Sequence, residues 1–308
     1  MKRQGYIICA GGANFDIHSR IQHPVVARDS NISHVHSSAG GVGRNIAENL
    51  ALLGNSCILL TALGDDAFGN RIASDCEKLG IDCSHAYIDK EHPTSTYIDI
   101  LDDTGDMYLA TNDMRILNYL PEDYFLSNAE LIQNAAAVVI DANLTTAQVE
   151  QITNIAFDSR VPVYADPVST VKADHILTSL PKMRFIKPNA MELAKLSGMN
   201  TDTYPEIEKA AASLLDKGLK QIAVSLGGRG AYYAERNGIS FFVKLNKAAE
   251  MVNASGAGDA FTAAFVHKDI NGADANEKTE FAMYCGMLTV QCEDTINPEI
   301  AKLTSEVF

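Results

Sequence analysis

The chain has 308 residues, of which 46% are hydrophobic and 21% charged, and these are ordinary values for a globular protein with a sizeable core. Its 25 Lys and Arg residues against 39 Asp and Glu residues give a net charge of −14, which argues against a nucleic-acid-binding surface. No stretch approaches the roughly 20 apolar residues that a bilayer span needs, so we expect no membrane partner.

The first apolar run, residues 6–11, leads directly into Gly-Gly-Ala-Asn. We interpret it as a buried strand and not as a signal peptide, because no cleavage site follows it. The six cysteines form no C-x-x-C pair, and most of them lie in apolar segments. Free thiols in a reducing compartment are the expected state, which predicts a cytoplasmic protein.

Apolar runs and amphipathic segments then alternate for most of the chain. Residues 42–54 and 67–80 have helical periodicity, and each segment ends in a glycine that can close a helix. Runs without polar alternation predict strands buried on both faces, and they cover residues 56–64, 135–143, 161–167, 183–189 and 221–228. Repeated units of this kind predict an α/β fold with a mostly parallel sheet covered by helices.

Two segments interrupt this pattern. Residues 17–38 and 92–113 alternate between apolar and polar side chains, which predicts half-exposed antiparallel strands. The sequence DDTGD at 102–106 suits the turn of a hairpin. We expect the two inserts to form a small second sheet over one end of the main one, within a single domain of residues 1–308.

The strongest motif is NASGAGDAFTAAF at residues 253–265. A glycine-rich loop that opens a helix exposes N–H groups at the positive end of the helix dipole, here those of Gly256, Ala257 and Gly258. Such groups hold a phosphate or a developing phosphoryl charge. Asp259 lies in the first turn, where a carboxylate either caps the helix or takes the proton of an attacking hydroxyl group.

Three further motifs lie at predicted strand ends or helix starts. SAGGVGRN at 38–45 lets the backbone approach a ligand closely, although a tight turn before a helix explains it equally well. In KPNAMEL at 187–193, Asn189 and Glu192 have the spacing of a capping box and also suit a hydrated Mg²⁺ ion. SLGGRGAYY at 225–233 is explained by a hairpin with a glycine-rich turn.

Taken in order, the motifs resemble those of the ribokinase-like family of carbohydrate and nucleoside kinases. The resemblance covers nearly the whole chain and rests on GGANFD at 11–16, GG-x-G-x-N at 40–45, N-x-x-E at 189–192, S-x-G-x-x-G at 225–230 and GAGD at 256–259. It implies a three-layer α/β/α fold, a β-sheet lid formed by the inserts at about 17–38 and 92–113, and ATP and Mg²⁺ as cofactors. A Walker A sequence is absent, which excludes a P-loop kinase.

Within this family the chain is most similar to pseudouridine kinases, through residues 40–54, 94–107, 112–114 and 166–169. This similarity implies phosphorylation of the 5′-hydroxyl of pseudouridine. Ribose, uridine or a hexose stays open as the alternative substrate. A non-catalytic ligand sensor would be expected to lack the base or the anion-binding loop, and both are present.

The resemblance also implies a role for each matching residue. Asp259 is the base, the amides of Gly256 to Gly258 stabilise the transferring phosphoryl group, and Asn189 and Glu192 organise Mg²⁺ through water. The nucleotide is expected against Asn189, Ser225, Gly227 and Gly230, and the substrate against Asn14, Asp16, Gly41 and Asn45.

The second insert is expected to contribute to the base pocket. Asn112, Asp113, Thr94 and Thr96 are the candidate acceptors, although each is explained equally well as a polar residue on a solvated strand. Asn253 stands where ribokinases usually carry a carboxylate of a monovalent-cation site, so dependence on K⁺ is left open. Alternating apolar residues on the lid strands predict a homodimer formed through the lid.

Overall fold

The computed structural model describes residues 5–244 and 252–304. Its central sheet has the strand order β15-β14-β13-β12-β11-β10-β1-β4-β6, in which β14 pairs antiparallel with both β13 and β15 and the other pairs are parallel. The bounds are β1 Ile7–Ala10, β4 Cys57–Leu60, β6 Ile81–Asp82, β10 Ala137–Asp141, β11 Val163–Asp166, β12 Phe185–Ile186, β13 Gln221–Ser225, β14 Ala231–Glu235 and β15 Ser240–Val243. The predicted mostly parallel sheet is confirmed.

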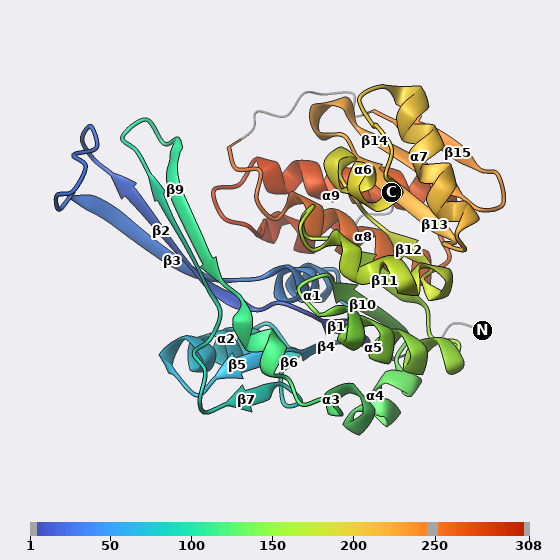
Figure 1. Cartoon of the computed structure of the whole chain (residues 1–308), viewed down its shortest axis with the longest axis horizontal. Helices are drawn as coiled ribbons and strands as arrows, with labels where there is room; N and C mark the ends of the chain where they lie inside the picture. Colours follow the sequence, from blue (N-terminus) through green and yellow to red (C-terminus); the bar gives the residue numbers. More distant parts are fainter. Residues whose placement is uncertain (1–4, 245–251, 305–308) are drawn as a thin grey trace.

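Helices cover both faces of this sheet (Figure 1). One face packs against α1 (Val42–Leu52), α2 (Ala67–Lys78), α8 (Ala257–Ile270) and α9 (Ala275–Val290), and the other against α3 (Tyr124–Ser127), α4 (Ala129–Asn134), α5 (Thr146–Asp158), α6 (Ala190–Ser197) and α7 (Tyr204–Asp216). Neighbouring residues of one strand belong to different core clusters: Ile7 lies in one cluster and Ile8 in the other. Burial on both faces is why these strands read as unbroken apolar runs, and the three-layer α/β/α fold is confirmed.

Local chemistry closes the helices where the sequence predicted. Gly54 and Gly80 follow α1 and α2 with φ of 80° and 73°, a left-handed conformation that glycine adopts without strain. The apolar run at 56–64 differs from the prediction of one strand. At Thr61 the hydroxyl donates to the Gly11 carbonyl at 2.7 Å, and beyond it β5 (Ala62–Gly64) leaves the central sheet to pair with β7 (Tyr87–Asp89).

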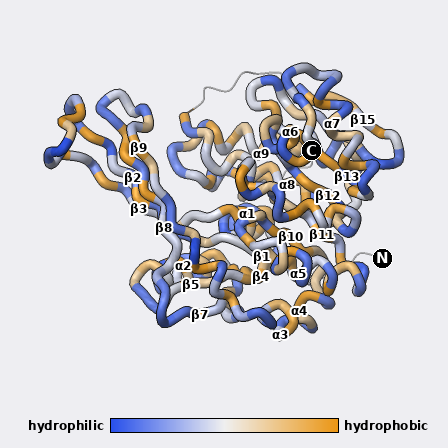
Figure 2. Tube along the Cα trace, in the orientation of Figure 1, coloured by the Kyte–Doolittle hydropathy of each residue, from blue (hydrophilic) through white to orange (hydrophobic). Residues whose placement is uncertain are grey.

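The two polar inserts form a separate four-stranded sheet, which we call the lid, that projects from the body (Figure 1). Its order is β3-β2-β8-β9, with bounds β2 Asn14–Ile21, β3 Ser33–Gly40, β8 Thr96–Leu101 and β9 Met107–Asp113. Each insert is an antiparallel pair as predicted, but β2 and β8 meet in parallel, which the sequence pattern did not indicate. Hydrophilic and hydrophobic residues alternate along these strands (Figure 2).

Strand register decides which lid residues face the body. Asp16 pairs with Tyr97, which pairs with Asn112, so these three side chains form one row on the same face. The neighbouring row consists of Phe15, Thr96 and Asp113, and its side chains lie on the opposite face of the lid. Phe15 itself stacks on Phe68 of α2, with ring centroids 4.5 Å apart.

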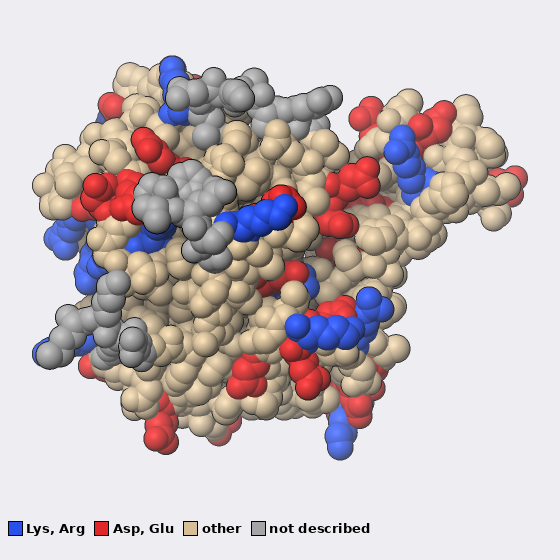
Figure 3. Space-filling model, turned by 180° about the vertical axis from the view of Figure 1, so that it is seen from behind, with Lys and Arg blue, Asp and Glu red and all other residues tan. Residues whose placement is uncertain are grey.

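The remaining described segments are short 3₁₀ helices: η1 (Arg115–Tyr119), η2 (Ala173–Lys182), η3 (Gly227–Arg229) and η4 (Pro298–Thr304). Within residues 5–244 and 252–304, none of the helices combines the length and the apolar character that a membrane crossing requires. On the face seen in Figure 3, Lys and Arg side chains are interspersed with Asp and Glu. The predicted single domain of residues 1–308 extends beyond the described residues and stays a prediction.

Candidate active site

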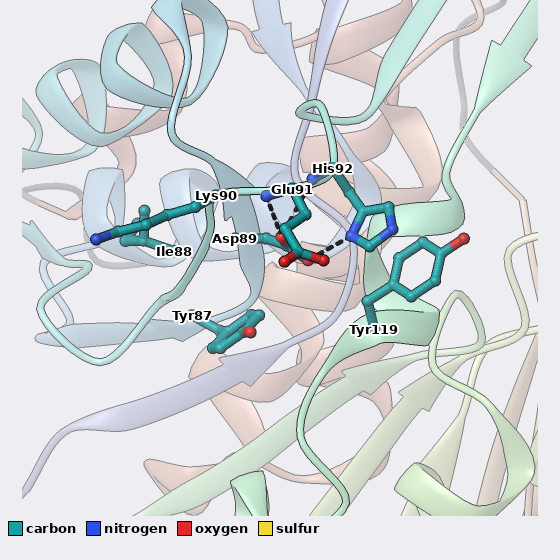
Figure 4. Close-up of a pocket in the computed structure, with 7 residues that line it drawn as sticks. All are labelled: Tyr87, Ile88, Asp89, Lys90, Glu91, His92 and Tyr119. Carbon is teal, nitrogen blue, oxygen red and sulfur yellow. Dashed lines mark hydrogen bonds and ion pairs between the residues drawn. The ribbon is translucent and has the colours of Figure 1, made fainter.

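Two hollows are candidates for a ligand site. The smaller, about 460 Å³, lies beside β7 and η1 (Figure 4). There Asp89 accepts hydrogen bonds from His92 Nδ1 at 2.9 Å and from the N–H groups of Glu91 and His92, while the His92 ring stacks on Tyr119. The Asp89 carboxylate is thus already satisfied by its own turn. The residues that line this hollow include no predicted site residue, so it is not the candidate site.

The larger hollow is a cleft of about 1370 Å³ between the inner face of the lid and the body. Segments from β2, α1, β9 and the start of α8 meet there, although they are far apart in the sequence. The predicted site residues that line it are Asn14, Asp16, Gly41, Asn45, Asn112 and Gly256. The cleft therefore gathers predicted substrate-binding residues and part of the anion-binding loop in one place.

Asp16 is the buried carboxylate of the cleft wall. It is 8% exposed and accepts a hydrogen bond from Asn14 Nδ2, two residues earlier on the same face of β2. Burial raises its pKa to about 6, against the lowering effect of the Asn14 hydrogen bond. A Cβ atom on Gly40 would lie 2.0 Å from Asp16 Oδ2, so the glycine at this position makes room for the carboxylate.

Asp259, in the first turn of α8, is not among the residues that line the cleft, and neither are Ala257 and Gly258, but it contacts Asn45, which does line it. Its Oδ2 accepts a hydrogen bond from Asn45 Nδ2 at 2.9 Å, so the carboxylate contacts α1 and does not simply cap its own helix. The side chain is buried, and burial together with the negative charge of Asp166 raises its pKa to about 8. A carboxylate tuned to this range can act as a general base near neutral pH.

Lys187 supplies the buried cation of the site, and the sequence analysis did not assign it a role. Its Nζ lies 3.4 Å from Asp166 Oδ2, and both side chains are about equally buried. Burial lowers the pKa of Lys187, but the carboxylates of Asp166, Glu192 and Asp259 outweigh that effect and raise it overall. The ammonium group therefore stays charged beside the predicted base.

The glycines of the α8 loop are required by close contacts. Gly256 has φ of 77°, and a Cβ atom there would lie 1.9 Å from the carbonyl oxygen of Thr295. A Cβ atom on Gly258 would lie 2.9 Å from Lys187 Nζ. The first N–H groups of a helix have no partner within the helix, so the bare turn at 256–258 leaves amides free beside a buried ammonium group. This arrangement suits an anion.

Asn189 and Glu192 form the capping box that the sequence allowed. Asn189 Oδ1 accepts from the N–H of Glu192, and both Glu192 oxygens accept from Asn189, one from its N–H and one from its Nδ2, each at 2.9 Å. Burial raises the pKa of Glu192, while the Lys187 ammonium lowers it. Within the described ranges no group of three His, Cys, Asp or Glu residues could cage a metal ion directly.

Asp166 and Glu192 nevertheless fit a hydrated Mg²⁺ ion. Both carboxylates are buried, and they are close enough that the negative charge of Asp166 raises the pKa of Glu192. Mg²⁺ typically binds one or two carboxylates together with waters and substrate phosphates. The predicted role of Asn189 and Glu192 is therefore compatible with their capping box, because a water-mediated contact leaves the helix cap in place.

The predicted nucleotide-binding residues lie at the end of β13, in the turn after it and at the start of α6, and they are not among the residues that line the cleft. Ser225 forms a parallel bridge with Asn189, and its N–H donates to the Pro188 carbonyl at 3.0 Å. Gly227 begins η3 and Gly230 follows its last residue, with φ of 59° and 98°. This end of β13 is thus joined to the start of α6, and the assignment to a nucleotide site stays a prediction.

Three predicted base-pocket residues lie elsewhere. Thr96 and Asp113 share the lid row that faces away from the cleft, and Asp113 pairs with Arg115 at 2.6 Å. Thr94 is buried, and its hydroxyl donates to Asp66 at 2.7 Å. Since neighbouring residues of a strand face opposite sides, the choice of Asn112 excludes Asp113 from the same wall.

Asn253 lines the cleft, and both polar atoms of its side chain are hydrogen-bonded to the backbone. Its Oδ1 accepts from the N–H of Ser255 at 2.9 Å, and its Nδ2 donates to the Glu293 carbonyl at 2.9 Å. Lys172 and Asn143, which also line the cleft, hydrogen-bond to each other, and the sequence motifs gave Lys172 no role. No signal short of the fold itself places Lys172 at the site, whereas Lys187 directly follows β12 and could be expected at the carboxyl edge of the sheet.

The chain is similar to known proteins in both sequence and fold. A family model described as "pfkB family carbohydrate kinase" matches residues 5–302. Pseudouridine kinase of Escherichia coli is 34% identical over 304 residues, covering 98% of this chain and 95% of the relative. Ribokinase of Arabidopsis thaliana is 28% identical over 298 residues, covering 94% and 77%. The solved structure of Arabidopsis thaliana ribokinase complexed with ribose and ATP has a TM-score of 0.86 at 24% identity and covers 99% of each chain, which shows the shared fold.

Proposed function

Because the chain belongs to the pfkB family of carbohydrate kinases, which are phosphotransferases acting on hydroxyl groups, we propose that it transfers the γ-phosphate of ATP to the 5′-hydroxyl of a nucleoside. Pseudouridine is the substrate of this proposal. The support is the 34% identity to Escherichia coli pseudouridine kinase over nearly the full length of both chains. The polar wall of the cleft, with side chains from β2, β8 and β9, suits a ribose and a polar base.

The substrate is held by its ribose. Asp16 accepts hydrogen bonds from two ribose hydroxyls, and Asn14 fixes the orientation of that carboxylate. Asn45 lies between the substrate and the base, because its amide donates to Asp259. This contact sets the 5′-hydroxyl within reach of the Asp259 carboxylate.

The chemical step needs a proton acceptor and an anion-binding group. Asp259 takes the proton of the 5′-hydroxyl as the O5′–P bond forms, and the bond from the γ-phosphorus to the leaving oxygen of ADP breaks. The free amides at Gly256 to Gly258 and the Lys187 ammonium lie where negative charge on the transferring group is stabilised. The lid covers the cleft and limits hydrolysis of ATP by water.

Mg²⁺ is expected to be held, through water, by Glu192 and Asn189 with Asp166 nearby. When bound, the ion neutralises charge on the phosphates. Ser225, Gly227 and Gly230, next to the start of α6, are proposed to line the nucleotide. Dependence on K⁺ has no support from Asn253, whose side chain is already hydrogen-bonded to Ser255 and to the Glu293 carbonyl.

The observation that carries the proposal is the hydrogen bond between Asn45 and Asp259, since it joins the substrate wall to the predicted base. The test is a set of steady-state assays with ATP on pseudouridine, uridine, ribose and a hexose. The proposal expects the highest kcat/KM on pseudouridine. Turnover of ribose or a hexose, with none on either nucleoside, would leave the family assignment and overturn the substrate.

A second part of the proposal is a homodimer through the outer face of the lid. Val35, Ile98 and Leu109 lie on that face and are 64%, 36% and 56% exposed, more apolar surface than an isolated lid would be expected to show. Leu109→Asp should give a monomer by light scattering. Met191→Asp, at an exposed apolar position of α6, should leave the mass unchanged.

We also place the enzyme in the cytoplasm. All six cysteines are unpaired, and four of them are buried, which supports a reducing compartment. Fractionation of cells that express the chain, with an antibody against it, tests this assignment.

A further inference from the structure

The lid carries a second buried carboxylate that the proposed mechanism does not use. Asp99 of β8 pairs with His18 of β2, two residues farther along the strands than the Asp16–Tyr97 pair. Because side chains alternate, both rows face the cleft, and all four residues line it. Asp99 and His18 therefore lie next to the ribose-binding residues in the direction of the lid tip.

The Asp99 carboxylate is only half satisfied. The residue is 5% exposed, and its Oδ2 lies 2.6 Å from His18 Nδ1. Its Oδ1 is buried and has no hydrogen-bond partner in the part of the chain that the structure describes. Leaving a buried acceptor unpaired is costly, and on a cleft wall that cost is removed when a ligand supplies a donor.

The geometry also fixes what His18 offers. A carboxylate only accepts hydrogen bonds, so His18 Nδ1 carries the hydrogen of that contact. In the neutral ring the other nitrogen, Nε2, is then an acceptor, and 32% of the His18 side chain is exposed on the cleft wall. Asp99 Oδ1 and His18 Nε2 together present acceptors and no donor.

We propose that the Asp99–His18 pair reads an N–H group on the edge of the nucleobase. The inference rests on the proposed function, because it places the ribose at Asp16 and the nucleobase beside His18 and Asp99, two residues farther along the strands. Pseudouridine presents a ring N–H where uridine presents a C–H, so acceptors at this place favour pseudouridine. His18 Nε2 and Asp99 Oδ1 accept from the base, and Asp99 Oδ2 also holds the tautomer of His18.

The experiment measures kcat/KM on pseudouridine and on uridine for His18→Phe and Asp99→Asn. His18→Phe keeps a flat ring and removes both nitrogens. Asp99→Asn leaves one acceptor oxygen where there were two, so the side chain no longer serves both His18 and a ligand. For both variants we expect kcat/KM on pseudouridine to fall about tenfold to a hundredfold and that on uridine to fall less than about threefold, so the preference narrows.

His34→Phe is the matched control. His34 lies on the same face of the lid and pairs with Arg20, but it is outside the cleft lining. The His34→Phe substitution should leave kcat/KM unchanged on both pseudouridine and uridine. Thermal melts identify a variant that does not fold, and His18→Gln then replaces His18→Phe.

Three outcomes separate the claims. A wild-type preference for pseudouridine that survives in both variants, or equal losses on both nucleosides, overturns the role of the pair and leaves the proposed function intact. A wild-type enzyme that phosphorylates neither nucleoside overturns both proposals. A preference that narrows in both variants, with His34→Phe unchanged, supports both.

Discussion

Asn45 of α1 and Asp259 of α8, which are 214 residues apart in the sequence, are joined by a hydrogen bond of 2.9 Å from Asn45 Nδ2 to Asp259 Oδ2. Helices α1 and α8 pack on the same face of the central sheet, so the contact is held by the core. In the proposed mechanism, a shift of α1 caused by a ligand would move the Asp259 carboxylate with it, and substrate binding would thereby be coupled to the position of the proton acceptor.

The first prediction concerns this base. Asp259→Asn keeps the size of the side chain but removes the proton acceptor. We expect kcat to fall about 10²- to 10⁴-fold, with little change in the KM for ATP, because positioning by the loop remains. Steady-state kinetics with a thermal melt as control measure this. A variant that keeps more than about a tenth of normal turnover would restrict Asp259 to its structural contact with Asn45.

The second prediction is a pH profile with a defined sign. Asp259 must be ionised to accept a proton, and burial raises its pKa to about 8. The kcat/KM for the nucleoside should therefore rise with pH, about tenfold per unit well below pH 8, and level off above it. A flat profile from about pH 6 to about pH 9 would contradict a base with this pKa.

Lys187→Met extends the second prediction. The ammonium group lowers the pKa of Asp259, so its removal should move the inflection to higher pH and reduce kcat at neutral pH. Lys209→Met removes the same charge from an exposed position of α7 and should leave the profile in place. An unchanged inflection in Lys187→Met would restrict Lys187 to a structural role.

Much of this site follows from local sequence signals. Parallel strands end at the same edge of a sheet, so the polar residues that follow β10, β11 and β12 could be predicted to converge. The glycine-rich starts of α1 and α8 follow from the need for bare backbone at a tight turn. The capping box at Asn189 and Glu192 is a pattern within four residues, and it forms as expected.

What could not be predicted depends on long-range register. The side-chain period of a strand is two, so a shift of one residue exchanges Asn112 for Asp113 on the cleft wall. The sequence proposed both residues, and only the pairing of β8 with β9 separates them. Lys187 was visible in its motif, but its place under Gly258 results from packing between β12 and α8.

The third prediction concerns the bare backbone of the loop. Gly258→Ala adds a Cβ atom that would lie 2.9 Å from Lys187 Nζ, so the ammonium group has to move. We expect kcat to fall by about tenfold or more with a modest change in melting temperature. Ala254→Val changes an exposed residue of the same loop and should keep normal turnover. Normal turnover in a folded Gly258→Ala protein would contradict an anion-binding loop.

The fourth prediction separates metal binding from helix capping. Glu192→Gln keeps an acceptor for the capping box, as Gln148 does in the capping box of Thr145, and it removes a carboxylate from the proposed Mg²⁺ site. We expect the Mg²⁺ concentration for half-maximal activity to rise. Glu206→Gln makes the same substitution in the capping box of Thr203 at the start of α7 and should leave the Mg²⁺ dependence unchanged. If the Mg²⁺ concentration for half-maximal activity is as unchanged in Glu192→Gln as in Glu206→Gln, Glu192 has no role in binding the metal ion.

The last prediction concerns the row that Asn112 shares with Tyr97 and Asp16. Its amide has both a donor and an acceptor, so it can bind a polar edge of either nucleobase, unlike a site that offers acceptors alone. Asn112→Ala should therefore lower kcat/KM on pseudouridine and uridine by a similar factor, about threefold to tenfold, and leave their ratio unchanged. Thr111→Ala changes the preceding residue of β9, which faces away from the cleft, and should have no effect. Equal rates in Asn112→Ala and Thr111→Ala would mean that the base does not reach β9. A loss on pseudouridine alone would instead give Asn112 a part in discrimination.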